Sequence, residues 1–169
     1  LPVPPGFTIT TECCIEYLKK SQFPLELRND VNEMIFNVES VMGSQFGSIQ
    51  KPLLLSIRSG ARQSMPGMME TVLNVGLTEK TIPGLIKIFK DEKFVYDAYR
   101  RLIMMYSDVV MEKAGGITVP KGQLSIREEL ESIMEDMKKK NNIIHDSGLS
   151  ANQLKELSAL FKKKIKSKL

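Results

Sequence analysis

The chain has few of the residues that usually build catalytic or metal centres. It has no tryptophan, one histidine and two cysteines among 169 residues. The two cysteines, Cys13 and Cys14, are adjacent, a spacing that rarely forms a disulfide, so we expect reduced thiols in a cytoplasmic compartment. The histidine, His145, lies in a polar stretch and is interpreted as a surface residue. No metal site is therefore expected in this chain.

Long apolar runs and a signal-peptide pattern are also absent. No apolar stretch approaches the roughly 20 residues that a helix needs to cross a bilayer, so no membrane partner is expected. Neither the Walker Gly-Lys-Ser/Thr pattern nor Gly-x-Gly-x-x-Gly occurs, which excludes the two commonest nucleotide-binding loops. At 42% hydrophobic and 26% charged residues, the composition is that of a globular protein. Its length suits one domain or two subdomains.

The net charge of +4 is mild, and much of the excess lies near the end of the chain. No aromatic side chains are interleaved with these lysines to stack on bases, so we interpret them as a solvated helix face and expect no nucleic-acid partner. A helical half that docks protein or nucleic acid through this tail is the alternative. The tail lysines are Lys162, Lys163, Lys164, Lys166 and Lys168.

The most informative stretch is 53–76. An apolar run, Leu53–Ile57, predicts a buried strand that ends at Arg58, and Gly60 follows at once. A second strand is predicted at Thr71–Val75. A guanidinium group matches phosphate oxygens in pairs, and glycine lets backbone N–H groups come close to an anion. The pattern favours a phosphate site, although an ordinary hairpin with solvent-facing arginines has the same spacing.

Apolar periodicity predicts a helix-rich α/β (α+β) chain. Residues 1–10 are expected to be extended, with Phe7 and Ile9 in a half-buried strand. The first predicted helix runs from Thr10 or Thr11 to about Lys20, and the second covers 25–42 with one buried stripe. The third begins at about Glu79 with Pro83 in its first turns, and the fourth covers 92–113, with Asp91 as its cap and Phe94 inward. The fifth runs from the Ser125–Glu128 capping box to about Asn141, and the last is capped by Ser150 and Gln153.

The segment 56–77 closely resembles the signature of the pyruvate, phosphate dikinase family. It reads Ser-Ile-Arg-Ser-Gly-Ala-Arg-Gln-Ser-Met-Pro-Gly-Met-Met-Glu-Thr-Val-Leu-Asn-Val-Gly-Leu. Segments 3–12 and 94–110 are similar to the same family. Dikinases that use water carry Ser-Ser-Ala-Thr after the arginine, so the Gly-Ala-Arg here favours the pyruvate, phosphate branch. The resemblance implies part of an ATP-grasp nucleotide-binding subdomain over 1–77 and a helical subdomain over 78–169.

The resemblance also implies a function. The parent enzyme, a phosphotransferase, would convert ATP, phosphate and pyruvate to AMP, pyrophosphate and phosphoenolpyruvate through a phosphohistidine on another domain. It would use Mg²⁺ and form a homo-oligomer. The chain lacks an initiator methionine and the family's upstream lysine segment, so we expect a fragment. A non-catalytic dikinase-like nucleotide-binding or protein-docking module is the alternative.

By the same resemblance, Arg58 is the expected catalytic residue. Arg100 and Arg101 could also reach a phosphate, but ion pairing on a helix surface is the favoured interpretation. Asp108 and Glu112 are acidic, but the family's metal ligands come later in the domain. The residues expected to bind ATP are Ser59, Arg62, Gly67, Met68 and Met69.

Overall fold

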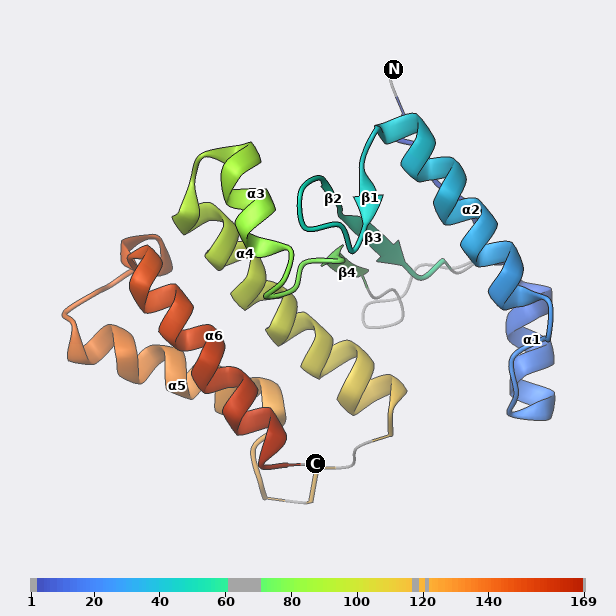
Figure 1. Cartoon of the computed structure of the whole chain (residues 1–169). Helices are drawn as coiled ribbons and strands as arrows, with labels where there is room; N and C mark the ends of the chain where they lie inside the picture. Colours follow the sequence, from blue (N-terminus) through green and yellow to red (C-terminus); the bar gives the residue numbers. More distant parts are fainter. Residues whose placement is uncertain (1–2, 61–70, 117–118, 121, 169) are drawn as a thin grey trace.

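The structure, a computed structural model, describes residues 3–60, 71–116, 119–120 and 122–168. These residues form six α-helices, four short strands, a π-helix and a short 3₁₀ helix. The predicted class, a helix-rich α/β or α+β chain, is confirmed. Figure 1 shows two regions: α1 and α2 lie on one side, α3 to α6 cluster on the other, and the strands lie between them.

The N-terminal helices have the predicted bounds but only part of the predicted burial. α1 spans Thr11–Lys20 and α2 spans Leu27–Met42. α1 has no buried residue. In α2 the predicted stripe is buried at Val38 and half-buried at Leu27, Val31, Met34 and Ile35, whereas Val41 and Met42 are exposed, so the stripe is confirmed only in part. The reason is that few described residues cover α2. Its clearest tie to the strands is Glu39 Oε1, which accepts a hydrogen bond from Phe46 N–H at 2.7 Å.

The segment before α1 is extended but forms no strand among the described residues. Phe7 is 38% and Ile9 53% exposed, so the half-buried strand predicted there is wrong. Alternating apolar residues need a neighbouring strand to become a ladder, and the described residues provide none.

Four strands pair into two small sheets. β1, Gln45–Phe46, pairs in parallel with β2, Pro52–Leu53. β3, Leu55–Arg58, pairs antiparallel with β4, Thr71–Val75. β4 has the bounds predicted for Thr71–Val75, whereas the apolar run Leu53–Ile57, expected as one strand, is divided between β2 and β3. The chain passes from one sheet to the other at this division.

The helical region follows the sequence patterns closely. α3 spans Ile82–Phe89, and α4 spans Glu92–Met105 and continues as the π-helix η1, Tyr106–Ala114. α5 spans Ile126–Lys140, the 3₁₀ helix η2 spans Asp146–Gly148, and α6 spans Ala151–Lys166. The N-cap at Asp91 and the capping boxes at Ser125–Glu128 and Ser150–Gln153 are all confirmed. The π-helical turn was not predicted, because its residues have the same apolar spacing as an ordinary helix.

The core lies where α4 packs between α6 and β4 (Figure 1). Phe94, expected to face inward, is instead 53% exposed and makes an edge-to-face contact with Phe89 at 5.3 Å. The fully enclosed apolar side chains are Leu130, Leu149, Leu157 and Phe161.

Among the residues that the structure describes, no helix is both long enough and apolar enough to cross a membrane.

Two leucines of α6 provide a test of this core. Leu157 is 0% and Leu160 is 38% exposed. Leu157→Ala should lower the free energy of unfolding by about 2–5 kcal/mol, because it removes buried methyl groups and leaves a cavity. Leu160→Ala, the control on the same helix, should have a clearly smaller effect in urea denaturation. Equal losses would contradict the described packing.

Candidate phosphate-binding site

Arg58 is the last residue of β3 and lies opposite Thr71, the first residue of β4. The strand register therefore brings Arg58 and Thr71, the residues that flank segment 59–70, side by side. The Arg58 side chain is exposed and makes no ion pair with any described residue. A guanidinium group without a carboxylate partner keeps its full charge and all its donors for a ligand.

The strand that carries Arg58 is not buried as predicted. Leu53 in β2 is 4% exposed, but Ile57 in β3 is 58% exposed. Burial falls along the chain: Pro52 of β2 lies against Gly84 of α3, whereas the residues of β3 after Leu55 are exposed. Arg58 is thus at the exposed end of β3, and the residues that precede β3, Pro52 and Leu53 of β2, are buried.

The other residues expected to bind ATP lie at or beyond this strand end. Ser59 follows Arg58 directly and is exposed. Arg62, Gly67, Met68 and Met69 are outside the described residues, so their assignment stays a prediction.

β4 holds the hairpin against the helical core. Val72 is 6% exposed and belongs to the same buried cluster as Val95 of α4. The register shifts between Leu55 and Ile57 of β3, and Asn74 has φ of 60°, so β4 carries one extra residue there. Asparagine is one of the few residues other than glycine that tolerate this backbone region. The sequence analysis missed this bulge, although an asparagine within a strand-like run is a usable signal for it.

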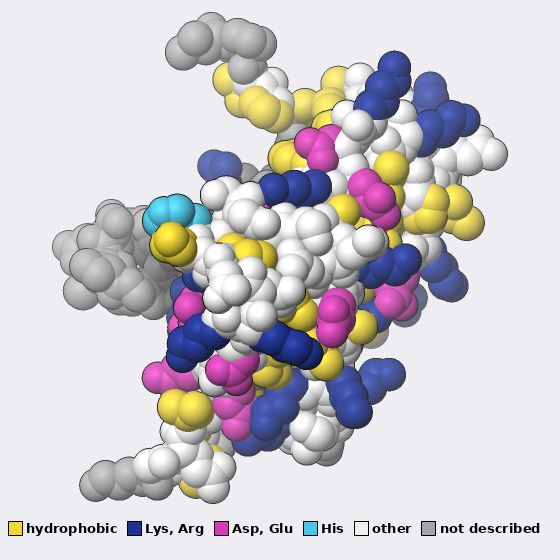
Figure 2. All heavy atoms as spheres, turned by 90° about the vertical axis from the view of Figure 1, so that its left-hand side faces the viewer, with side chains coloured by type: hydrophobic (Ala, Val, Ile, Leu, Met, Phe, Trp, Pro, Cys, Tyr) yellow, Lys and Arg dark blue, Asp and Glu magenta, His cyan; other side chains and the backbone are white. Residues whose placement is uncertain are grey.

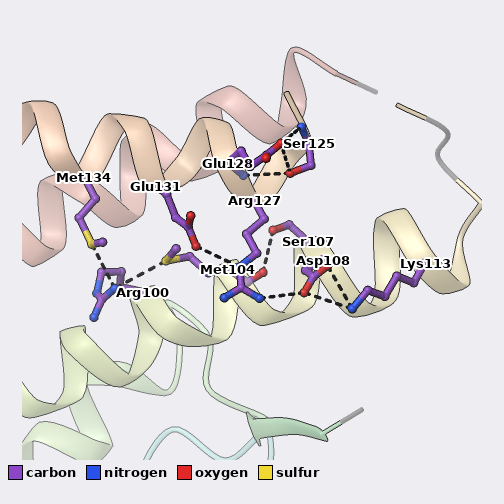
Figure 3. Close-up of polar contacts among 10 residues, drawn as sticks. All are labelled: Arg100, Met104, Ser107, Asp108, Lys113, Ser125, Arg127, Glu128, Glu131 and Met134. Atoms are coloured by element: carbon purple, nitrogen blue, oxygen red, sulfur yellow. Dashed lines mark hydrogen bonds and ion pairs between the residues drawn. The ribbon is translucent and has the colours of Figure 1, made fainter. Parts of the chain in front are cut away.

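Arg100 is not available to a phosphate. It is 4% exposed, and its Nη2 lies 2.7 Å from Asp97 Oδ1 and 3.6 Å from Asp146 Oδ2. Its Nη1 also donates to Met134 Sδ at 3.2 Å, which ties α4 to α5 (Figure 3). Arg101 pairs with the second oxygen of Asp97 at 2.7 Å. The favoured interpretation, ion pairing, is confirmed, but Arg100 pairs inside the fold and not on its surface.

Asp108 and Glu112 also have structural partners. Asp108 lies 3.0 Å from Arg127 Nη1 and within 3.4 Å of Lys113 Nζ, which joins η1 to α5 (Figure 3). Hydrogen bonds to Glu131 and Asp108 raise the pKa of Arg127 above its usual range. Glu112 accepts a hydrogen bond from Ile126 N–H. Within the described ranges, no three His, Cys, Asp or Glu side chains gather in a way that could hold a metal ion.

The lysine-rich end of α6 is partly neutralised within the chain. Lys162 pairs with Glu79, and Lys164 and Lys168 both pair with Glu129, at 3.3 and 3.0 Å. Figure 2 shows basic and acidic side chains interspersed on the left-hand side of the molecule in Figure 1. Interspersed signs produce no strong one-sign field for a polyanion. His145 is exposed, as predicted.

Comparisons with known proteins agree with the resemblance seen in the sequence. No family model matches the chain. The chain is 44% identical over 163 residues to pyruvate, phosphate dikinase of Clostridium symbiosum, and 42% identical over 170 residues to that of Rhizobium meliloti (strain 1021). It is 42% identical over 162 residues to pyruvate, phosphate dikinase 2 of Oryza sativa subsp. japonica. These matches cover 96–100% of the chain but only 17–18% of the length of the relatives.

The buried pairing of Arg100 leads to a prediction. Arg100→Met should lower the free energy of unfolding by about 1.5–3 kcal/mol, because it removes hydrogen bonds to charged partners. Asp97 keeps Arg101 as a partner, and Asp146 keeps Lys138 at 3.0 Å. Urea denaturation measures the loss, and ATP titration of the same variant should show unchanged affinity. Weaker ATP binding far below the melting temperature would assign Arg100 to the ligand site instead.

Proposed function

We propose, on the premise that this chain is homologous to the pyruvate, phosphate dikinases, that it forms part of an ATP-binding site in which Arg58 contacts the phosphates. One observation carries this proposal. Arg58 is exposed at a strand end and has no ion pair with any described residue, whereas Arg100 and Arg101 are held by carboxylates. Segment 56–77, which contains this arginine, is the part of the chain that most resembles the family.

The residues around Arg58 fit a polyphosphate. The base of the hairpin brings the guanidinium of Arg58 and the backbone N–H groups of Ser59 and Gly60 to one strand end. Such donors suit phosphate oxygens, and the guanidinium plane allows two parallel hydrogen bonds. By resemblance, Arg62 and the backbone of Gly67, Met68 and Met69 complete the set. Mg²⁺ would be held by carboxylates that belong to another part of the parent protein.

The reaction proposed for the parent is that of the family. ATP, phosphate and pyruvate become AMP, pyrophosphate and phosphoenolpyruvate, with a histidine on a separate domain carrying the phosphoryl group between sites. In this scheme residues 1–77 belong to an ATP-grasp subdomain and 78–169 to a helical subdomain of the same domain. Arg58 would offset the negative charge that is redistributed over the phosphates during transfer. Electrostatic stabilisation of the transition state of this kind is usually the largest single contribution to catalysis.

Arg58→Ala tests the assignment. Loss of a charge-assisted contact should weaken ATP binding by about 1.5–3 kcal/mol, which is roughly 10- to 150-fold in Kd. Arg28, an exposed arginine in the first turn of α2, provides the matched control. Calorimetric titration of the wild type, Arg58→Ala and Arg28→Ala with ATP compares them directly. Equal affinity in the wild type and Arg58→Ala would refute a phosphate contact.

A second prediction concerns turnover by these 169 residues alone. We expect weak ATP binding and no conversion of ATP to AMP, because in the family the phosphohistidine and the metal-binding carboxylates come from other segments. Incubation of the purified chain with ATP, Mg²⁺, phosphate and pyruvate, followed by nucleotide chromatography, measures this. AMP formed in proportion to the chain, and lost in Arg58→Ala, would show that the segment is catalytic by itself.

A further inference from the structure

The turn between β1 and β2 packs directly on α3 at a position where only glycine fits. A Cβ built on Gly84 would lie 2.0 Å from the carbonyl oxygen of Ile49 and 3.2 Å from Pro52 Cδ. At the end of β4, a Cβ on Gly76 would lie 2.7 Å from the carbonyl oxygen of Leu53. Figure 1 shows this turn and β2 beside α3. Gly76 and Gly84 thus leave room for the backbone of residues 49–53, which leads into β3.

The turn itself is internally braced. Ser48 Oγ accepts hydrogen bonds from Gln50 N–H and Lys51 N–H, both at 3.2 Å. Gln45 N–H donates to the carbonyl oxygen of Lys51 at 2.9 Å. These hydrogen bonds make the turn resistant to local deformation. A displacement at Ile49 would therefore move the whole β1–β2 unit.

α3 is fixed as well. Thr81, 1% exposed, precedes the helix, and its Oγ1 accepts from Thr78 N–H at 2.8 Å and donates to the carbonyl oxygen of Gly76 at 3.0 Å. Ile82 and Leu85 are each 3% exposed in the core. The helix is thus held on the side away from the turn. Of the two contacting parts, the β1–β2 unit buries only Pro52 and Leu53 of its two strands, fewer residues than α3, so we expect it to be the part that moves.

We propose that Gly84 is a positioning residue for the Arg58 site: its missing side chain seats the Ile49 turn, and this contact sets where β2, β3 and the Arg58 guanidinium lie relative to the helical region. The inference rests on the proposed function, because it assigns Gly84 to the same ATP-phosphate site. Only two residues separate Pro52, which lies against Gly84, from Leu55, the first residue of β3, so a shift of β2 passes directly to β3. Gly84 itself contacts no ligand.

Gly84→Ala gives a result whose sign is diagnostic. Where alanine fits the backbone, this change removes unfolded-state entropy and raises the melting temperature by about 1–4 °C. Here the added methyl must move away from the Ile49 oxygen by about 1 Å or more to reach the 3.0 Å that real contacts respect. We expect the melting temperature to fall by about 4 °C or more. We also expect ATP affinity to fall about tenfold or more, since a 1 Å misplacement of a binding group weakens its contacts strongly.

The experiment compares four chains by ATP titration and by two-dimensional amide NMR, well below every melting temperature. Gly6→Ala is the matched glycine control, because no described atom lies within 4 Å of its added Cβ. Leu157→Ala controls for lost stability alone, because it unsettles the core without touching the turn. Gly84→Ala should weaken ATP binding and shift the amide signals of residues 55–58. Both controls should leave the affinity and those signals as in the wild type.

Each outcome decides a different point. Wild-type amide signals over 55–58 in a folded Gly84→Ala chain would overturn the positioning role, whatever ATP does. Shifted signals with unchanged ATP affinity would also overturn it, if Arg58→Ala weakens binding. If Arg58→Ala itself leaves ATP affinity unchanged, the proposed function fails, and with it the positioning role. Should Gly84→Ala not fold, Ser48→Ala replaces it: loosening the turn must then shift residues 55–58 and weaken ATP binding, and wild-type behaviour would refute the inference.

Discussion

Packing of β4 on the helical core is the constraint on which the rest of the structure depends. Val72 is buried with Val95 of α4, and among the described residues the two-stranded β3–β4 hairpin shares no hydrogen-bonded ladder with the other sheet. An isolated two-stranded hairpin is marginal in water, so it needs such an anchor. Because β4 is fixed and paired in register with β3, the core constrains the position of the exposed Arg58 through this pairing, and the proposed Gly84 contact would constrain it through β2.

The charged side chains divide into two groups with different roles. Several charged side chains in the helical region satisfy one another: Arg100 pairs with Asp97 of the same helix and with Asp146, and Asp108 pairs with Arg127. A buried cation without such partners would be strongly destabilising, so these pairs are needed wherever the helices close over charge. Arg58 is different because the fold provides it with no described partner. Arg28 of α2 also has no described ion pair, so what favours Arg58 is its lack of a described partner together with its place in the segment that most resembles the dikinases.

The two ends of this chain differ in how much they bury. The helical region α3 to α6 buries Leu130, Leu154 and Leu157, whereas α1 buries no residue at all. At Gly76 and Gly84 the backbone lies directly against the backbone of Leu53 and Ile49, which is possible only because glycine has no side chain. Close backbone contact of this kind fixes geometry more narrowly than side-chain packing, because it leaves few rotamers through which a displacement could be absorbed.

The sequence by itself determined the local features of this protein. Helix bounds, the caps at Asp91, Ser125 and Ser150, and β4 follow from periodicity and capping chemistry, which depend on residues a few positions apart. Tertiary structure alone decided the burial of Arg100, the exposure of Ile57 and the seat at Gly84. These depend on which distant segments meet, and spacing along the chain carries no information about that. The register that places Arg58 opposite Thr71 belongs to both, since the strands were predicted and only the bulge in β4 was not.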